Sequence, residues 1–332
     1  MNRDLLDLHT GTQVDVSYAN SSKLIMSWKQ TLPLLNIKLR PRVAPKDSVI
    51  YVWGALIATG DFIIDIDNPW SLVGYNLRAM PLYNRLIKFI LLSKRCREIR
   101  CMSEACRNSL CSLFGMAVYA KATVHYPCIS PVSTVIKPSG DVCRFLFVGT
   151  QFEIKGGEAM LKAFRRVYAR LGSCRLDVIA HLPPDFAALA EGCDGLVVHK
   201  AHFTRDEVHT RFMQNADVLI LPTYVESFGM VALEALAHGL AVIATDVYAL
   251  SELVDNGVNG NLLSPPISIW DGVMPSSAYF KLSDIKQLIR AADTSLFELE
   301  LEQSIERFVV DREWRLRARQ ASTKLMTERF AC

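Results

Sequence analysis

The sequence contains no long hydrophobic run. The longest candidate, residues 86–92, is interrupted by Lys88 and is much shorter than the ~18 residues of a membrane-spanning helix. The first seven residues contain Asp4 and Asp7, where a signal peptide would have an apolar core. We therefore expect a cytoplasmic protein, with at most a peripheral contact at the inner face of a membrane.

Cysteine pairs at metal-binding spacing are also missing. The nine cysteines form no Cys-x-x-Cys pair, and their odd count in a chain of 332 residues is typical of thiols in a reducing cytosol. Cys96, Cys101, Cys106 and Cys111 recur every fifth residue, which matches neither a helix nor a strand, so we expect buried or incidental thiols. The histidines at 199, 202 and 209 have no further Cys or His at ligand spacing, and we expect no metal site.

Acidic residues are scarce in the first 140 residues. This part has 17 Lys and Arg against 9 Asp and Glu, a net charge of +8, whereas residues 141–332 have 20 against 25, a net charge of −5. Much of the positive charge lies in residues 84–97, where we expect an apolar helix that ends in a basic cluster. That helix either fills the core, with cations that complement its dipole, or presents residues 85–100 to an anionic membrane or a lipid diphosphate. No motif with interleaved aromatics predicts a nucleic-acid partner.

Length and composition indicate two globular domains. Hydrophobic residues make up 50% of the chain and charged residues 21%, and 332 residues suffice for two ordinary domains. The Lys-Pro-Ser-Gly-Asp segment at 137–141 has the composition of a linker. We expect an N-terminal domain over residues 1–140, a second domain over 141–295, and C-terminal helices over 296–332.

The second domain alternates short apolar runs with helical patterns, which predicts a parallel sheet covered on both faces. Ligands of such sheets bind at the carboxyl ends of the strands. In the first domain, Ser103 and Glu104 predict a helix start. The expected strands are 49–53, 62–66, 99–102 and 123–126 in the first domain, and 145–149, 175–180, 196–199, 218–221 and 241–244 in the second.

The most informative segment is residues 216–235. A buried strand is expected to end at Pro222, a loop carries Glu226, and a helix that starts near Gly229 carries Glu234. The N-terminus of a helix favours a phosphate. Two carboxylates beside a phosphate suit a ligand that has hydroxyl groups at both ends of a diphosphate. This arrangement predicts a nucleotide-sugar site.

The spacing of these residues resembles that of the retaining glycosyltransferases of family 4, also called group 1. Their hallmark is two glutamates separated by seven residues within a Pro-Ser-x-x-Glu-x-Phe-Gly-x-x-x-x-Glu-Ala pattern, and the similarity continues to residue 263 and back to residue 144. The residues that carry it are Pro222, Thr223, Glu226, Phe228, Gly229, Glu234 and Ala235, followed by Gly239, 241–246, Glu252 and 256–260, and preceded by 147–157.

The resemblance implies an α/β protein with the GT-B fold, in which two Rossmann-like domains face each other across a cleft. Members usually open with a glycine-rich loop, whereas residues 1–47 contain Gly11 as their only glycine. We therefore expect a shortened N-terminal domain. In the family, the last helix crosses back onto the first domain, and we expect the same of residues 296–332.

The resemblance also implies roles for individual residues. Lys155 would stabilise the leaving diphosphate, Glu226 would contact the sugar hydroxyls, and Glu234 would contact the ribose. Thr150 stands where many members have an arginine. Asp67 is either a third catalytic group or the cap of the turn at Pro69. The expected catalytic residues are Lys155, Glu226 and Asp67, and the expected donor site is Gly149, Thr150, Lys155, Glu226, Ser227, Phe228, Gly229, Met230 and Glu234.

The predicted activity is transfer of a sugar from a UDP- or GDP-linked donor to a glycan, polysaccharide or lipid-linked acceptor. The expected chemistry needs no cofactor or metal, because Lys155 and a helix N-terminus supply positive charge. Three alternatives stay open: a nucleotide-sugar-binding subunit that needs a partner, a sugar-nucleotide epimerase, and a phosphorylase on the same fold.

Overall fold

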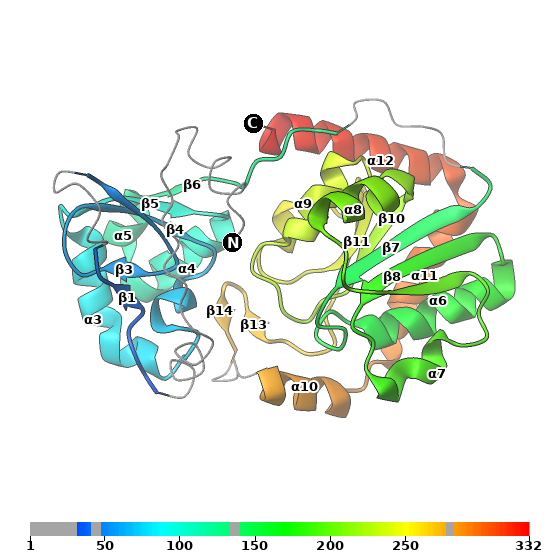
Figure 1. Cartoon of the computed structure of the whole chain (residues 1–332), viewed down its shortest axis with the longest axis horizontal. Helices are drawn as coiled ribbons and strands as arrows, with labels where there is room; N and C mark the ends of the chain where they lie inside the picture. The colour runs from blue at the N-terminus through cyan, green and yellow to red at the C-terminus, as the bar shows by residue number, and fades with distance from the viewer. Residues whose placement is uncertain (1–31, 41–47, 133–139, 277–281, 332) are drawn as a thin grey trace. The chain divides into compact units, whose positions relative to one another are not determined.

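A computed structural model of the protein describes residues 32–40, 48–132, 140–276 and 282–331. The chain divides into two compact units, drawn in Figure 1: residues 1–127 with 269–285, and residues 128–268 with 286–332. Gly11, most of the glycine-poor first segment and the linker residues 137–139 lie outside the described residues.

The first unit is built around a parallel four-stranded sheet with the order β2-β4-β5-β6. Apolar residues of β4 and the α3 and α4 helices supply its core, as shown by fully buried Phe62, Ile64 and Leu110. The α4 helix begins as expected, because the Ser103 side chain accepts a hydrogen bond from the Cys106 N–H. Its elements are β1 Ile37–Lys38, β2 Ile50–Trp53, β3 Leu56–Ile57, β4 Phe62–Ile66, η1 Pro69–Val73, α3 Ala79–Leu92, β5 Cys96–Cys101, α4 Glu104–Phe114, α5 Met116–Lys121, β6 Ala122–Val124, β13 Trp270–Asp271 and β14 Met274–Pro275.

The basic segment of the first unit is not organised as expected. The α3 helix ends at Leu92 and has no basic residue in its last turn. The chain turns at Ser93 and enters β5, so Arg97 and Arg100 lie on a strand and pair with Asp61 and Glu98. The expectation of a helix that ends in a basic cluster is therefore wrong. From residue 96 onward, parallel pairing with β4 places the segment in the sheet in place of a continued helix.

The second unit contains a six-stranded sheet in which every pair of neighbours is parallel. All five strands expected in this region are confirmed, each within two residues. The bounds are β7 Cys143–Gly149, α6 Gly157–Leu171, β8 Cys174–Ala180, η2 Pro184–Phe186, α7 Ala187–Ala190, β9 Leu196–Lys200, α8 Arg205–Glu207, η3 Val208–Phe212, η4 Met213–Asn215, β10 Val218–Leu221, α9 Met230–Ala237, β11 Ala241–Thr245, η5 Leu250–Glu252, β12 Gly260–Leu263, α10 Leu282–Ala291, α11 Ser295–Val310, α12 Arg312–Leu325 and η6 Met326–Phe330.

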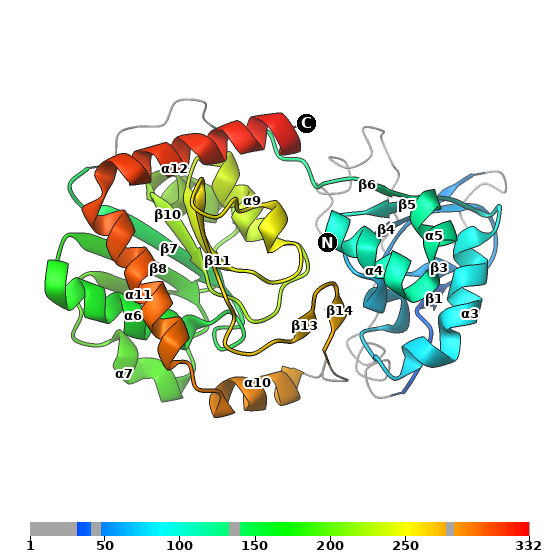
Figure 2. The same cartoon turned by 180° about the vertical axis from the view of Figure 1, so that it is seen from behind.

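The strand order of this sheet is β9-β8-β7-β10-β11-β12, the order of a Rossmann fold. The chain leaves β7 toward β8 and β9, and later returns to the other side of β7 with β10. The order therefore reverses between β7 and β10, and ligands of open α/β sheets bind in the crevice outside such a reversal. Figure 2 shows the sheet between its covering helices, with α6 and α11 on one face.

The last helices pack on the second unit. The α11 helix lies along α6, where its glutamates pair with basic side chains, as in the contact of Arg166 with Glu302 at 2.6 Å. The α12 helix brings the buried Arg319 guanidinium to within 2.9 Å of Asp217, which directly precedes β10. The expected return of these helices to the N-terminal domain concerns both units together and stays a prediction.

The cysteines agree in part with the expected free thiols. Cys96, Cys101 and Cys106 are free and buried, and Cys111 is free and partly exposed, as expected. Cys128, however, is disulfide-bonded, so the expectation of thiols alone is wrong at this position. Among the described residues, no helix has both the length and the apolar character that crossing a membrane requires.

Candidate nucleotide-sugar site

The first part of the site is the loop between β7 and α6. Gly156 has φ +73°, and a Cβ atom there would lie 2.0 Å from the Pro222 carbonyl oxygen. Only glycine allows this approach of the β7 loop to the end of β10. The Tyr224 N–H also donates to the Ile154 carbonyl at 2.9 Å. The two loops that carry the predicted residues are therefore tied together at the reversal between β7 and β10.

This close approach brings Lys155 onto Glu226. The Lys155 ammonium lies 2.8 Å from Oε2 of Glu226 and donates to the Val225 carbonyl at 3.1 Å. Both side chains keep partial access to solvent, with exposed fractions of 22% and 17%. Gly149 lies beneath, because a Cβ atom there would be 3.0 Å from Lys155 Cγ. Thr150 follows Gly149 and is exposed. These four predicted residues are thus brought together.

A third glutamate, Glu153, was not predicted from the sequence. Its side chain is only 3% exposed and contacts Lys286 at 2.9 Å and Arg290 at 2.7 Å, both from α10. Burial would raise the pKa of Glu153, but hydrogen bonds from Arg290 and Lys286 outweigh it and hold the pKa below its usual value. This carboxylate anchors the Lys155 loop to α10, and nothing in the local sequence indicates partners so far along the chain.

The second part of the site is the start of α9. Gly229 precedes the helix with φ +97°, and a Cβ atom there would lie 2.5 Å from Leu250. Ser227 and the buried Phe228 lie in the turn before it, and Met230 is the first helical residue. The first N–H groups of such a helix have no partner within it and attract anions. The start of α9 follows directly from the end of β10, at the same edge of the sheet as Lys155.

Glu234 lies on α9 with partners that the sequence analysis missed. Its Oε1 atom is 2.8 Å from Nε of Arg205, and its Oε2 atom is 3.5 Å from Nε2 of His209. The ring of His209 meets the ring of His238 edge-on at 4.9 Å. The available signal for Arg205 was the Thr-x-x-Glu pattern at residues 204–207, a capping box that follows a strand of the same sheet.

Asp67 lies in the first unit, after β4, and is described within that unit alone. Its Oδ2 atom accepts hydrogen bonds from Asn68 Nδ2 and from the Tyr75 hydroxyl, both at 3.4 Å. The turn at Pro69 is capped by Asn68, whose side chain accepts from the Trp70 N–H at 3.1 Å. The alternative role of Asp67 as the cap is therefore wrong. Its catalytic role stays a prediction.

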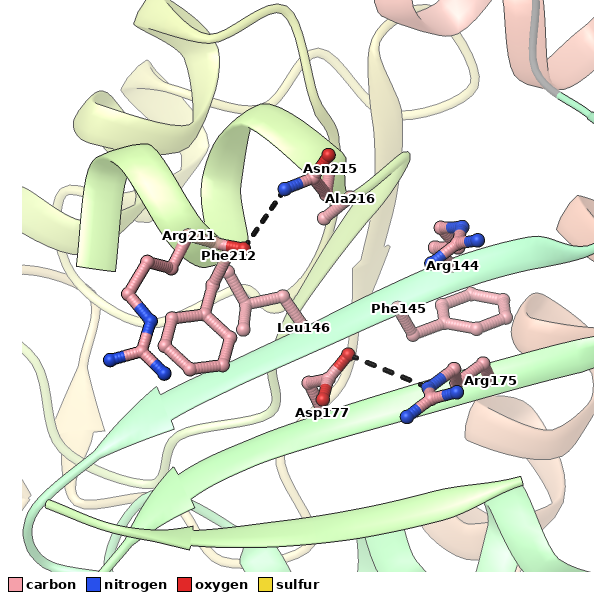
Figure 3. Close-up of a pocket in the computed structure, with 9 residues that line it drawn as sticks. All are labelled: Arg144, Phe145, Leu146, Arg175, Asp177, Arg211, Phe212, Asn215 and Ala216. Carbon is pink, nitrogen blue, oxygen red and sulfur yellow. Dashed lines mark hydrogen bonds and ion pairs between the residues drawn. The ribbon is translucent and has the colours of Figure 1, made fainter. Parts of the chain in front are cut away.

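A cavity of about 270 Å³ lies elsewhere on the second unit. Figure 3 shows Arg144 and Arg175 on neighbouring strands, with Arg211 on the facing wall. These residues stand at the starts of β7 and β8 and before β10, which is the opposite edge of the sheet from Gly149 and Lys155. None of the predicted donor residues lines this cavity. It is therefore separate from the candidate site.

The histidines and acids do not form a metal centre within the described parts of the chain, where no group of three or more His, Cys, Asp or Glu is placed to hold a metal ion. His199 instead lies 2.8 Å from Asp177. This observation concerns ligand geometry alone.

The comparisons with known proteins find similarity mainly in the second unit. The family model described as "Glycosyl transferases group 1" matches residues 143–271. The resemblance to the group 1 glycosyltransferases is confirmed over this segment. A D-inositol 3-phosphate glycosyltransferase of Arthrobacter sp. (strain FB24) is 35% identical over 128 residues, which are 36% of this chain and 30% of the relative.

A second relative extends further along the chain. An uncharacterized glycosyltransferase of Methanocaldococcus jannaschii is 30% identical over 207 residues, 56% of this chain and 52% of the relative. The chain thus spans about half or less of the length of these curated relatives.

Solved structures establish the fold. HepE of Anabaena, crystallised with UDP and glucose, aligns with a TM-score of 0.58 at 14% identity over 82% of this chain and 68% of its own. TarM of S. aureus aligns with a TM-score of 0.56 at 11% identity over 81% of this chain and 52% of its own. The predicted GT-B fold class is confirmed. The prediction of a shortened N-terminal domain rests on residues that lie mostly outside the described ones.

Proposed function

We propose that the protein is a retaining glycosyltransferase that moves a sugar from a nucleoside-diphosphate donor to a glycan, polysaccharide or lipid-linked acceptor. The observation that carries this proposal is the Lys155–Glu226 pair at the reversal of a Rossmann strand order. Relatives over residues 143–271 carry glycosyltransferase names, and the HepE structure contains UDP and glucose. The proposed donor is therefore UDP-linked or GDP-linked.

In the proposed reaction, the bond between the anomeric carbon and the diphosphate oxygen breaks, and a bond from that carbon to an acceptor oxygen forms. The diphosphate keeps the bonding electron pair, and its freed oxygen takes up the proton that the acceptor hydroxyl loses. Lys155 and the start of α9 act on the charge that develops on the diphosphate. Glu226 accepts hydrogen bonds from the sugar hydroxyls. The two glutamates bind the donor, so no glycosidase-like carboxylate pair is invoked.

A ligand panel tests the donor site. The purified protein is melted with UDP, GDP and ADP sugars, and the matching donor at ~100 times its dissociation constant stabilises the fold by ~2.7 kcal/mol. Lys155→Ala and Glu226→Ala should lose this shift while melting normally without ligand. If the donor stabilised both variants as much as the wild type, the assignment of Lys155 and Glu226 to the donor site would be wrong.

No metal or cofactor is proposed, because Lys155 and the helix N-terminus already supply positive charge beside the leaving group. Release of the nucleoside diphosphate should proceed at the same rate after exhaustive treatment with a chelator. Activity that is lost in chelator and restored by magnesium or manganese would overturn this part of the proposal.

A second candidate function is a nucleotide-sugar-binding subunit that needs a partner. The observation that favours it is Thr150, which stands exposed beside Lys155 where many group members have an arginine. Loss of one bidentate donor weakens leaving-group stabilisation by ~2 to 3 kcal/mol. Tight donor binding without release of the nucleoside diphosphate would favour the subunit over the enzyme.

We also propose a peripheral membrane contact through α3. The sequence left open whether the apolar residues of this helix fill the core, and the structure divides them: Ile87 and Leu91 are fully buried, whereas Leu82, Leu86 and Phe89 are 69%, 46% and 73% exposed. Leu82, Leu86 and Phe89 recur at helical spacing on one face. We call these three residues the apolar face of α3.

Positive charge on the same helix indicates which partner the apolar face of α3 would contact. Arg85 is exposed within α3, Lys88 is partly exposed, and Lys94 is exposed just beyond its end. Apolar side chains flanked by cations fit an anionic lipid surface, where each cation contributes ~1 kcal/mol near the headgroups. The proposed orientation places the apolar face of α3 at the membrane, in accord with a lipid-linked acceptor.

Vesicle co-sedimentation tests this contact. The wild type should bind vesicles that contain phosphatidylserine and should be released at high salt, because surface attraction is screened. Phe89→Ser should abolish binding. Leu296→Ser is the matched control, since Leu296 is an equally exposed apolar residue, 77% exposed, in the second unit. Equal binding to neutral and anionic vesicles, or none to either, would remove the membrane contact.

A further inference from the structure

Arg205 is presented at the ligand-binding edge of the second sheet. Strand β9 ends at Lys200, and α8 begins at Arg205 after a short loop. A capping box fixes this start: the Glu207 N–H donates to the Thr204 hydroxyl at 3.3 Å, and the Thr204 N–H donates to the Glu207 carboxylate at 2.8 Å. Because the carboxyl ends of parallel strands share one edge, Arg205 stands at the same edge as Lys155 and the start of α9.

The contacts of Arg205 converge on the second glutamate of the motif. Its Nε atom lies 2.8 Å from Oε1 of Glu234, and the two side chains are only 28% and 15% exposed. His209, one turn further along the same helical segment, approaches the other oxygen of Glu234 at 3.5 Å. Two residues of the segment that begins at Arg205 thus lie beside the carboxylate, with Arg205 as its ion-pair partner.

Arg205 and His209 are chemically different partners of Glu234. His209 packs against His238, and burial, together with His209, lowers the pKa of His238 to about 4, so the imidazole behind His209 is neutral near pH 7. Arginine remains protonated at any pH that a protein tolerates. Arg205 therefore places a permanent cation 2.8 Å from Oε1 of Glu234.

An ionised carboxylate has about four lone-pair sites. Arg205 and His209 each approach one oxygen of Glu234 without an aligned hydrogen bond, so lone pairs of both oxygens can accept from two neighbouring hydroxyl groups. We infer that Arg205 is a positioning residue that holds Glu234 for the 2′- and 3′-hydroxyls of the donor ribose, so that Arg205 sets the preference of the site for ribonucleotides over 2′-deoxyribonucleotides. This inference rests on the proposed function.

Calorimetry with matched nucleotides tests the inference. Wild-type protein is titrated with UDP, GDP and ADP, and then with the 2′-deoxy form of whichever one binds. A preference of about 10-fold or more for the ribonucleotide corresponds to one hydrogen bond to a charged group. Arg205→Ala should reduce that preference toward unity, and Arg205→Lys should restore part of it. Glu234→Gln gives the ribonucleotide preference that is expected when the contact of residue 234 with the ribose is lost.

Two further variants separate positioning from folding. Arg211→Ala removes an arginine of the same helical segment that is 57% exposed and lies 4.0 Å from Glu207, and it should keep the wild-type preference. The double variant Arg205→Ala, Glu234→Gln should have the preference of Glu234→Gln alone, because Arg205 acts through Glu234. Melting without ligand verifies that each variant is folded.

The outcomes are distinguishable. If wild-type protein binds no nucleotide, the proposed function fails and this inference fails with it. If it binds ribo- and deoxyribonucleotides equally, the ribose role of Glu234 and this inference fail, whereas the proposed function stands. If wild-type protein prefers the ribonucleotide and Arg205→Ala keeps the full preference, the role of Arg205 alone is overturned. Additive losses in the double variant would also overturn it.

Discussion

The ammonium group of Lys155 lies 2.8 Å from Oε2 of Glu226, although the two residues are 71 positions apart in the sequence. The pair joins the loop after β7 to the loop after β10, on the two sides of the strand-order reversal. The proposed cation for the leaving group and the proposed acceptor for the sugar hydroxyls are thus neighbours. Removal of either one should affect the other's position as well as its own contact.

Lys155→Ala and Glu226→Ala should each lower turnover by at least ~100-fold without unfolding the protein, because both side chains act on the reacting end of the donor. Release of the nucleoside diphosphate measures this loss. Lys162→Ala is the matched control, since Lys162 lies on the α6 helix and pairs with Glu158 of that helix and with Glu298 of α11. Wild-type rates in both site variants would contradict the assignment.

Gly156→Ala should destabilise the protein more than Gly172→Ala does. Both glycines have positive φ, but a Cβ atom at residue 156 would lie 2.0 Å from the Pro222 carbonyl, whereas one at residue 172 meets nothing within 4 Å. The strained backbone alone costs ~1 kcal/mol, and forced overlap adds ~1 to 3 kcal/mol. Denaturant unfolding measures the difference. Equal losses in the two variants would show that the β7 and β10 loops separate easily.

Arg319→Ala should lower the free energy of unfolding by ~3 to 5 kcal/mol, because it leaves the buried Asp217 carboxylate without its cation. Arg319 is 2.9 Å from Asp217, and both side chains are less than a tenth exposed. Arg317→Ala, on the same helix but 61% exposed, should change stability by no more than ~1 kcal/mol. Similar losses in both would argue that the buried pair adds little.

Asp65→Asn should stabilise the protein at about pH 8 and have little effect below about pH 4. Burial raises the pKa of Asp65 from 3.8 to about 7, with the nearby Arg100 acting in the opposite direction. Between about pH 4 and pH 7 the folded protein therefore holds a proton that the unfolded chain releases, so the contribution of this group to stability falls over that range and is constant above it. Melting temperatures across this pH range test the sign. If the melting temperature of Asp65→Asn did not exceed that of the wild type above pH 7, ionisation of Asp65 would cost the folded protein no stability.

The sheet of the second unit could be predicted almost completely because its strands are buried on both faces. Val218–Leu221 and Ala241–Thr245 are continuous apolar runs with every residue buried, which is the pattern of central parallel strands. The end of α3 was harder, since basic residues continue past Leu92 into a half-exposed strand. There, hydrogen bonding to β4 decides the structure, and no local pattern reports it.

The candidate site also has a part that could be predicted from the sequence and a part that could not. Lys155, Glu226 and Glu234 stand in local motifs, so their neighbourhood at one edge of the sheet could be predicted. Their partners could not. Glu153 meets α10 from 133 positions away, and the pairing of Arg205 with Glu234 depends on how two helices pack on the sheet. Such contacts between distant segments leave no periodicity in the sequence.

The buried contact of Arg319 with Asp217 joins the segment that matches the family model to a helix that lies outside it. The segment shared with the glycosyltransferase family ends at residue 271, yet the cation that neutralises its buried carboxylate comes from α12, beyond that end. A recombinant fragment cut at the limits of the shared segment would lack this partner. The segment recognised by homology is therefore smaller than the segment that folds.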